Sequence, residues 1–125
     1  MPRFVVLSHR TPPGYARGDH WDFMLEIAGA LRTWALPTEP AAGDPADAEL
    51  LADHRIEYLQ LEGPLSGERG SVTRWDAGSY DVLEVSDDQW RVRLGGAKLQ
   101  GVVTLRRSAD QRWSFSFVPG VSSGG

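Results

Sequence analysis

Apolar and polar residues alternate along much of the chain, in short runs. The clearest run covers residues 20–27, in which every odd-numbered residue is large and apolar. A period of two is typical of a strand with one face in the core, so this run predicts a strand with its odd positions buried. Residues 28–30 predict a turn and residues 31–36 a returning strand, which makes a hairpin that ends at Pro37.

Similar runs recur before and after this hairpin. The expected strands are residues 4–7, 56–61, 72–75, 80–85, 90–94, 99–105 and 113–118, with turns at 76–78, 87–88 and 95–96. Strands about 8–12 residues apart, with turn residues between them, are typical of a small antiparallel barrel or sandwich. The pattern therefore predicts a mainly β fold.

One segment favours a helix instead. Asp44 can cap a helix whose first residue is Pro45, and Asp47 and Glu49 then lie in its first turn. These signals predict a short helix over residues 45–52. The alternative is an acidic, flexible loop.

The length of 125 residues fits one domain, which we expect to span residues 1–120 with a flexible tail at 121–125. A net charge of -4 gives no global cationic field, so any contact with nucleic acid has to be local. The chain has no cysteine, which excludes disulfides, iron–sulfur clusters and thiolate zinc sites. No apolar run approaches the length of a membrane span or a signal peptide, so we expect a soluble, cytoplasmic protein.

Three residues form a candidate metal site. His20 and Asp22 are two apart in the expected strand and therefore share a face. His9 ends the apolar run 4–7, which can lie beside that strand. Two imidazoles and a carboxylate suit Mn²⁺, Zn²⁺ or Fe²⁺. The spacing alone leaves open whether these side chains bind a metal or are ordinary polar residues.

His54 and Tyr58 form a second candidate pair, since residues four apart share a face on a strand or on a helix. They could address one ligand, or they could belong to a helix-to-strand junction with a partly buried tyrosine. A further alternative is the facial triad of non-haem iron oxygenases, in which His54 would join His20 and Asp22. The small span from 20 to 54 disfavours it.

Several motifs occur in an order that resembles one known family. They are FVVLSH at residues 4–9, HWDFMLE at 20–26, GALRTWALP at 29–37, DHRIEY at 53–58, EG at 62–63, WDAG at 75–78 and LGGAKLQG at 94–101. Together they resemble the 3′-phosphoesterase domain of bacterial DNA ligase D, a module of end-joining repair, over about residues 4–107.

The resemblance implies a small antiparallel β-barrel with one or two short helices. It implies an Mn²⁺-dependent hydrolase, with Zn²⁺ as a second choice of metal, that removes a 3′-terminal ribonucleoside and then the 3′-phosphate from DNA. On this basis His9, His20 and Asp22 are the metal ligands. His54 and Tyr58 match the residues that contact the scissile phosphate.

The sequence also departs from the family pattern. Met24 and Thr38 stand where the family has cations, the acidic-apolar stretch 47–51 replaces an expected arginine, and the basic N-terminal arm is not seen. Compensating phosphate contacts could come from four arginines: Arg10, Arg17, Arg32 and Arg55.

Two functions follow from these departures: a phosphoesterase, or a catalytically impaired module that binds metal and DNA ends. The expected partners are nucleic-acid 3′ ends or another phosphorylated substrate, with or without separate ligase and polymerase proteins. We expect a monomer that does not contact membranes.

Overall fold

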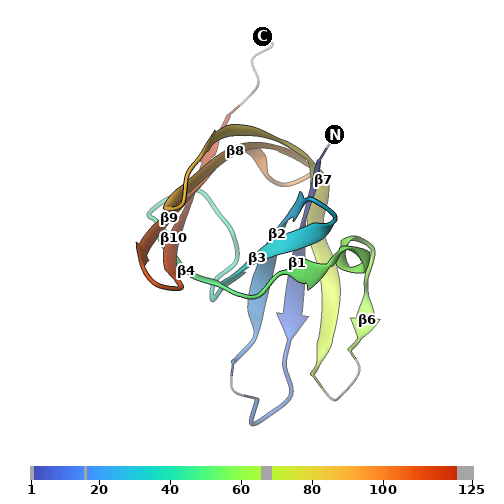
Figure 1. Ribbon diagram of the computed structural model, residues 1–125. Coiled ribbons are helices and arrows are strands. Elements are labelled where there is room, and N and C mark those ends of the chain that lie inside the picture. Colours follow the sequence, from blue (N-terminus) through green and yellow to red (C-terminus); the bar gives the residue numbers. More distant parts are fainter. Residues whose placement is uncertain (1, 16, 66–68, 121–125) are drawn as a thin grey trace.

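The computed structural model describes residues 2–15, 17–65 and 69–120 (Figure 1). The elements in chain order are β1 (Arg3–Arg10), β2 (His20–Ile27), β3 (Ala30–Leu36), β4 (Ala46–Leu50), β5 (His54–Arg55), the 3-10 helix η1 (Ile56–Leu59), β6 (Gly63–Pro64), β7 (Ser71–Val85), β8 (Gln89–Gly96), β9 (Gln100–Ala109) and β10 (Arg112–Pro119). The prediction of a mainly β fold is confirmed.

Eight of these strands close into an antiparallel barrel. Their order around the barrel is β1-β2-β3-β4-β10-β9-β8-β7, and the pairing of β1 with β7 closes the ring. The two short strands branch from this wall, with β5 on β3 and β6 on β7. The structure therefore confirms the barrel that the family resemblance implied.

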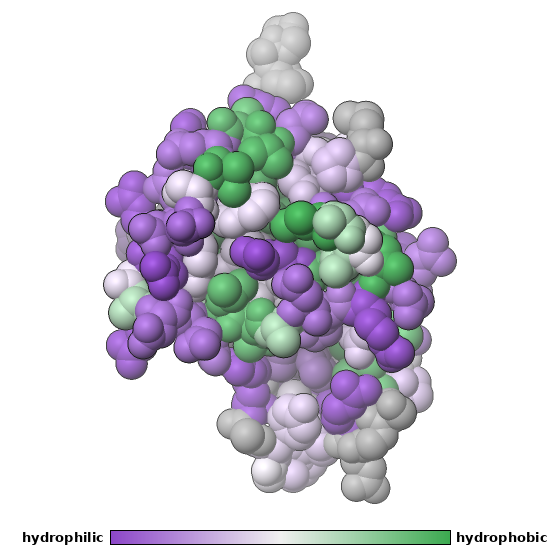
Figure 2. Space-filling model, viewed as in Figure 1, coloured by the Kyte–Doolittle hydropathy of each residue, from purple (hydrophilic) through white to green (hydrophobic). Residues whose placement is uncertain are grey.

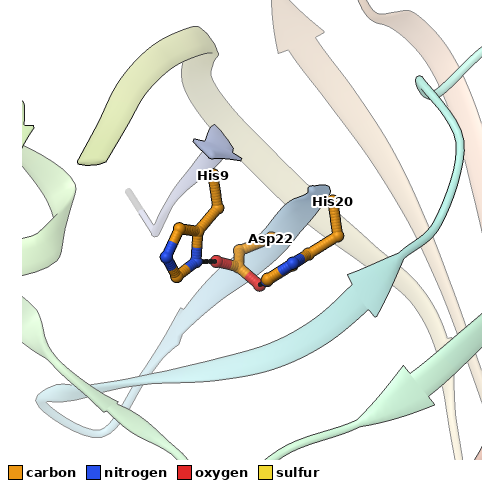
Figure 3. Close-up of side chains that lie close together, drawn as sticks. All are labelled: His9, His20 and Asp22. Carbon is orange, nitrogen blue, oxygen red and sulfur yellow. Dashed lines mark hydrogen bonds and ion pairs between the residues drawn. The ribbon is translucent and has the colours of Figure 1, made fainter. Parts of the chain in front are cut away.

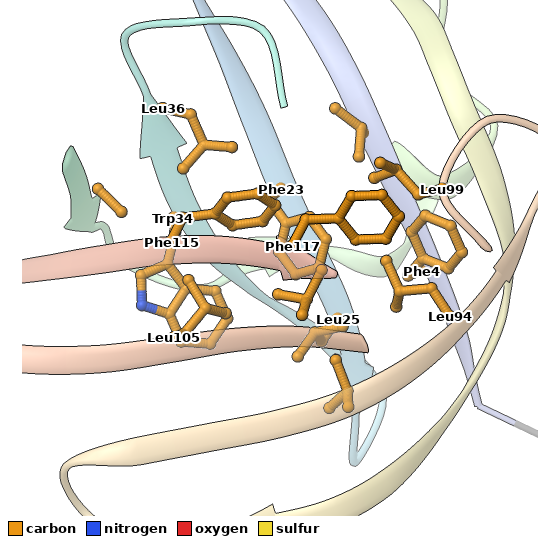
Figure 4. Packing of buried hydrophobic residues seen from close by; sticks show 14 of the residues in the cluster. Phe4, Phe23, Leu25, Trp34, Leu36, Leu94, Leu99, Leu105, Phe115 and Phe117 are labelled. Atoms are coloured by element: carbon orange, nitrogen blue, oxygen red, sulfur yellow. The ribbon is translucent and has the colours of Figure 1, made fainter. Parts of the chain in front are cut away.

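The barrel interior is filled by aromatic and aliphatic side chains (Figure 4). Phe23 and Leu25 of β2 are fully buried there, and Trp21 and Ile27 pack partly buried against the same cluster. The predicted core face of residues 20–27 is thus confirmed. Trp34 lies edge-on to Trp113 with 5.5 Å between ring centroids, so these two tryptophans serve core packing.

A second apolar layer lies on the outer face of the wall formed by β1, β2, β3 and β7. Its buried members are Val5, Leu7, Met24, Leu31, Leu59 and Val72, and the cover comes from η1 and the residues that follow it. On the even-numbered face of β2, His20, Asp22 and Met24 are therefore buried as well. This outer layer positions the candidate site.

The predicted helix over residues 45–52 is wrong, because this segment contains the strand β4. Trp34 of β3 pairs with Leu50, and Phe115 of β10 pairs with Ala46, so β4 bridges the two strands. A helix here would leave the barrel open, and the hydrogen bonds of the closed ring outweigh the local capping signals. The strand expected at 56–61 is wrong too, because residues Ile56–Leu59 form η1.

The expected turn at residues 76–78 is also absent, since β7 runs through it. A bulge opposite Val6 and Leu7 absorbs one residue of β7. Gly78 serves a close approach instead of a turn, because a Cβ there would collide with the carbonyl of Gly95. The turn expected at 95–96 lies at residues 97–98, after the end of β8.

Apolar residues on the face shown in Figure 2 form separate patches between hydrophilic ones. No helix among the residues described is long and apolar enough to cross a membrane. The tail predicted at 121–125 lies outside the described residues.

Candidate metal centre

His9, His20 and Asp22 converge at one end of the β1–β2 pair (Figure 3). His9 and His20 are direct cross-strand partners, and Asp22 follows His20 on the same face. Asp22 Oδ2 lies 3.3 Å from Nδ1 of His9, and Oδ1 lies 3.1 Å from Nε2 of His20. One ligand atom from each residue falls within 4.8 Å of the others. The structure therefore brings together the three residues predicted to hold a metal.

The far nitrogen of each imidazole is anchored to a backbone carbonyl. Nδ1–H of His20 donates to the carbonyl of Gly18 at 2.8 Å, and Nε2–H of His9 donates to that of Arg69 at 2.9 Å. A carbonyl can only accept, so these contacts fix where each ring carries a proton. The nitrogens that face Asp22 are then the ones available to a metal.

The carboxylate of Asp22 is buried between the two rings. Burial by itself would raise the pKa of Asp22, but the two imidazoles outweigh burial and hold the pKa at about 2. The hydrogen bond with Asp22 also raises the pKa of His9 above 6.5, against the effect of burial. The site therefore favours positive charge next to this carboxylate.

One carboxylate oxygen of Asp22 is buried without a hydrogen-bond donor in the described chain. Oδ1 is close to the His20 ring, yet it has no hydrogen bond of acceptable geometry within the described chain. Neutral imidazole nitrogens that face a carboxylate bring lone pairs together, which only a proton or a cation between them relieves. The donor set of two imidazoles and one carboxylate thus fits a divalent transition metal.

His54 and Tyr58 line the same cavity as this triad, which has a volume of about 130 Å³. Their rings meet edge to face with centroids 5.1 Å apart. Nδ1–H of His54 donates to the carbonyl of Ala52 at 3.1 Å, which leaves Nε2 for another partner. His54 is outside the group of converging ligand atoms, so the iron-oxygenase triad does not match this arrangement.

Of the four candidate arginines, Arg17 is the one that lines the cavity within the described chain. Its Nη1 donates to Oε1 of Glu49 at 2.8 Å. The other three lie in surface ion pairs, Arg10 with Asp19, Arg32 with Asp53 and Arg55 with Glu57. The structure does not bring them to the triad.

Arg69 also lines the cavity and was not among the four arginines. It belongs to the glycine-rich stretch at residues 66–70, whose composition predicts only a turn, so spacing did not distinguish it from the other arginines near the motifs. Met24, which replaces an expected cation, is fully buried in the outer apolar layer, and Thr38 is exposed.

Residues 14–107 match the DNA Ligase D 3′-phosphoesterase domain family. This chain belongs to that family. It is 36% identical over 121 residues to the multifunctional non-homologous end joining DNA repair protein LigD of Mycobacterium tuberculosis, which covers 88% of the chain. It is 31% identical over 109 residues to the LigD protein of Pseudomonas aeruginosa, which covers 75% of the chain.

These relatives are much longer proteins. The chain spans 15% of the mycobacterial relative and 13% of the Pseudomonas one. The match therefore concerns only one part of each relative, and the family resemblance drawn from the motifs is confirmed.

Proposed function

We propose that this chain is a metal-dependent phosphoesterase that acts on 3′-phosphorylated nucleic-acid ends. The observation that carries the proposal is the single cavity lined by the triad, His54 and Tyr58. Membership of the 3′-phosphoesterase family supports it. We further propose that residues 1–120 form one domain and that the protein is a monomer. Its substrates would be DNA ends, and it would act alone or beside separate ligase and polymerase proteins.

His9, His20 and Asp22 would hold the metal, for which we propose Mn²⁺, with Zn²⁺ as the second choice. When bound, the metal supplies Lewis-acid polarisation of a phosphoryl oxygen. Asp22 keeps its negative charge at neutral pH because its pKa is about 2. Carbonyl anchors hold both rings in the required orientation.

The remaining residues act on the phosphate itself. The Tyr58 hydroxyl would donate a hydrogen bond that orients it. Nε2 of His54, whose ring is held through the Ala52 carbonyl, would protonate the leaving oxygen or stabilise negative charge there as water attacks in line. Arg17 would add a charge-assisted hydrogen bond to a phosphate oxygen.

The test is release of phosphate from a 3′-phosphorylated primer–template with and without Mn²⁺. We expect Mn²⁺-stimulated release by the native chain and its loss in His20→Ala. His54→Gln should keep metal binding and lose turnover, which separates the two sets of residues. Absence of Mn²⁺-dependent release would refute the enzyme, and end-specific DNA binding without turnover would favour a binding module.

Single substitutions of the arginines sharpen the assignment. Arg17→Gln should lower turnover, whereas Arg10→Gln, Arg32→Gln and Arg55→Gln should stay near the native rate because they lie in surface pairs. An equal loss in all four variants would show that net charge matters and not the cavity position.

A further inference from the structure

Two hollows of the surface meet at Arg17 and His20. One is the metal cavity, and the other is a wider groove of about 1180 Å³ between the loop 17–20, β4 and the turn joining β9 to β10. The charged residues of the groove are Arg17, Arg112, Asp19, Asp47, Glu49 and Asp110. Carboxylates outnumber cations there, so a phosphate is favoured on the cavity side of Arg17 and disfavoured on the groove side.

Arg17 and Glu49 meet on this boundary. The Nη1–Oε1 distance is 2.8 Å, and the side chains are 36% and 48% exposed. Glu49 belongs to β4 and is held by pairing with Ala35 and Arg112, whereas Arg17 comes from the loop between β1 and β2. The carboxylate is therefore the anchored partner, and the guanidinium is held by it.

A guanidinium carries five N–H groups, so Arg17 can hold Glu49 and still offer donors to a second anion. Its charge, however, is largely neutralised by the carboxylate. An anion that enters the cavity has to compete with Glu49 for this charge, and it also feels the repulsion of the Glu49 carboxylate.

We propose that Glu49 is a positioning residue that keeps Arg17 at the mouth of the metal cavity and, by competing for it, weakens the hold on phosphate. This rests on the proposed function, since Arg17 is taken to contact the phosphate. The consequence for turnover is that inorganic phosphate, the product, leaves faster than it would from an unopposed arginine.

The experiment measures binding of inorganic phosphate to the full chain by calorimetry, with and without Mn²⁺. Glu49→Gln keeps an acceptor for Arg17 and removes the charge, so phosphate should bind about two- to fivefold tighter, as expected for an exposed ion pair. Arg17→Gln should bind about tenfold more weakly. In the double variant, the gain from Glu49→Gln should fall below about twofold, because no arginine is left to release.

The matched control is Glu84→Gln, which removes a carboxylate from another exposed pair, with Arg91 at 3.8 Å. It should leave phosphate affinity unchanged. An equal gain in Glu84→Gln, no gain in Glu49→Gln, an undiminished gain in the double variant, or no measurable phosphate binding by any variant would each overturn the proposal.

Steady-state kinetics give a second readout. Glu49→Gln should lower KM without raising kcat, because the substrate and the product are both held more tightly. Failure of the proposed function appears as the absence of Mn²⁺-dependent phosphate release. That result leaves the phosphate-binding comparison standing, so the two failures are distinguishable.

Discussion

Two aspartates are buried beside neighbouring residues of β1, and their carboxylates are satisfied in opposite ways. Asp22 of β2 pairs with Leu7 and faces the outer layer, whereas Asp76 of β7 pairs with Val6 on the interior face. Asp76 accepts hydrogen bonds from four backbone N–H groups, those of Ala77, Ala97, Lys98 and Leu99, at 2.8–3.1 Å. Asp22 faces two imidazoles, and one of its oxygens lacks a hydrogen bond within the described chain.

The difference separates an acid that holds backbone segments together from an acid that we propose binds a metal. Backbone amides that enclose a carboxylate fix the turn after β8 and leave no room for a ligand. Titratable rings around a carboxylate leave its charge to be balanced by a proton or a cation, both of which bind reversibly. The exposed fractions are similar, 3% for Asp22 and 5% for Asp76, so burial does not distinguish their roles. The identity of the hydrogen-bond donors does.

The largest expected effect on stability is that of Asp76→Ala. The substitution leaves four N–H groups near the core without an acceptor, so the free energy of unfolding should fall by roughly 3–4 kcal/mol. Urea denaturation followed by tryptophan fluorescence measures this. A loss below about 1 kcal/mol would mean that water replaces the carboxylate and that the comparison overstates its structural role.

Asp22→Asn should have the complementary effect. It removes a ligand charge and keeps the shape, so Mn²⁺ affinity should fall by more than about 100-fold while the metal-free chain stays folded. Calorimetric metal titration and circular dichroism test the two parts. Unfolding of metal-free Asp22→Asn would place Asp22 in the same class as Asp76.

The pH dependence of stability gives an effect of about 2 kcal/mol. The folded pKa of Asp22, about 2, lies below 3.8, so its contribution is present above pH 3.8 and is lost as the pH falls toward 2. The raised pKa of His9 contributes below pH 6.5, and this part is lost as the pH rises through the folded value.

Without metal, this site therefore stabilises the fold most between about pH 4 and 6.5. Added Mn²⁺ should restore stability at higher pH, where the His9 ring is neutral and can act as a ligand. Urea denaturation over a pH series, with and without EDTA, measures the loss of stability at low pH and the loss at high pH. An identical profile in Asp22→Asn would show that other groups cause it.

A smaller loss of stability than that of Asp76→Ala is expected for Gly96→Ala. A Cβ at Gly96 would collide with the Asp76 carboxylate and lie 2.6 Å from Phe4. The free energy of unfolding should therefore fall by about 1–3 kcal/mol. Gly95→Ala is the matched control, because its Cβ would meet Ser79 at an ordinary 3.7 Å. Equal stability of the two variants would show that the turn around Asp76 yields easily.

The convergence of His9, His20 and Asp22 could be predicted from sequence because it depends on a single strand pair. A period of two places His20 and Asp22 on one face, and β1 needs only to pair with β2 to bring in His9. The motifs at 75–78 and 94–101 also marked a real feature, since they meet around Asp76. Their role could not be inferred, because Asp76-Ala77-Gly78 has the composition of a turn and only the pairing partners show that it lies within a strand.

Other parts depended on the closed barrel. The capping signals at Asp44 and Pro45 are genuine local preferences, but two strand edges had to be joined and β4 joins them. In the same way, Arg17 could not be distinguished from Arg10, Arg32 and Arg55 by spacing. Only the fold shows which of them lies beside the cavity.

The three residues proposed to bind the metal all belong to one antiparallel pair, whereas the groups proposed to face the phosphate come from the connecting loop and from the segment around η1. Inheritance can therefore act on the two sets separately. Substitutions in the loop and around η1 can therefore change which phosphate ester is bound without altering the residues proposed to hold the metal.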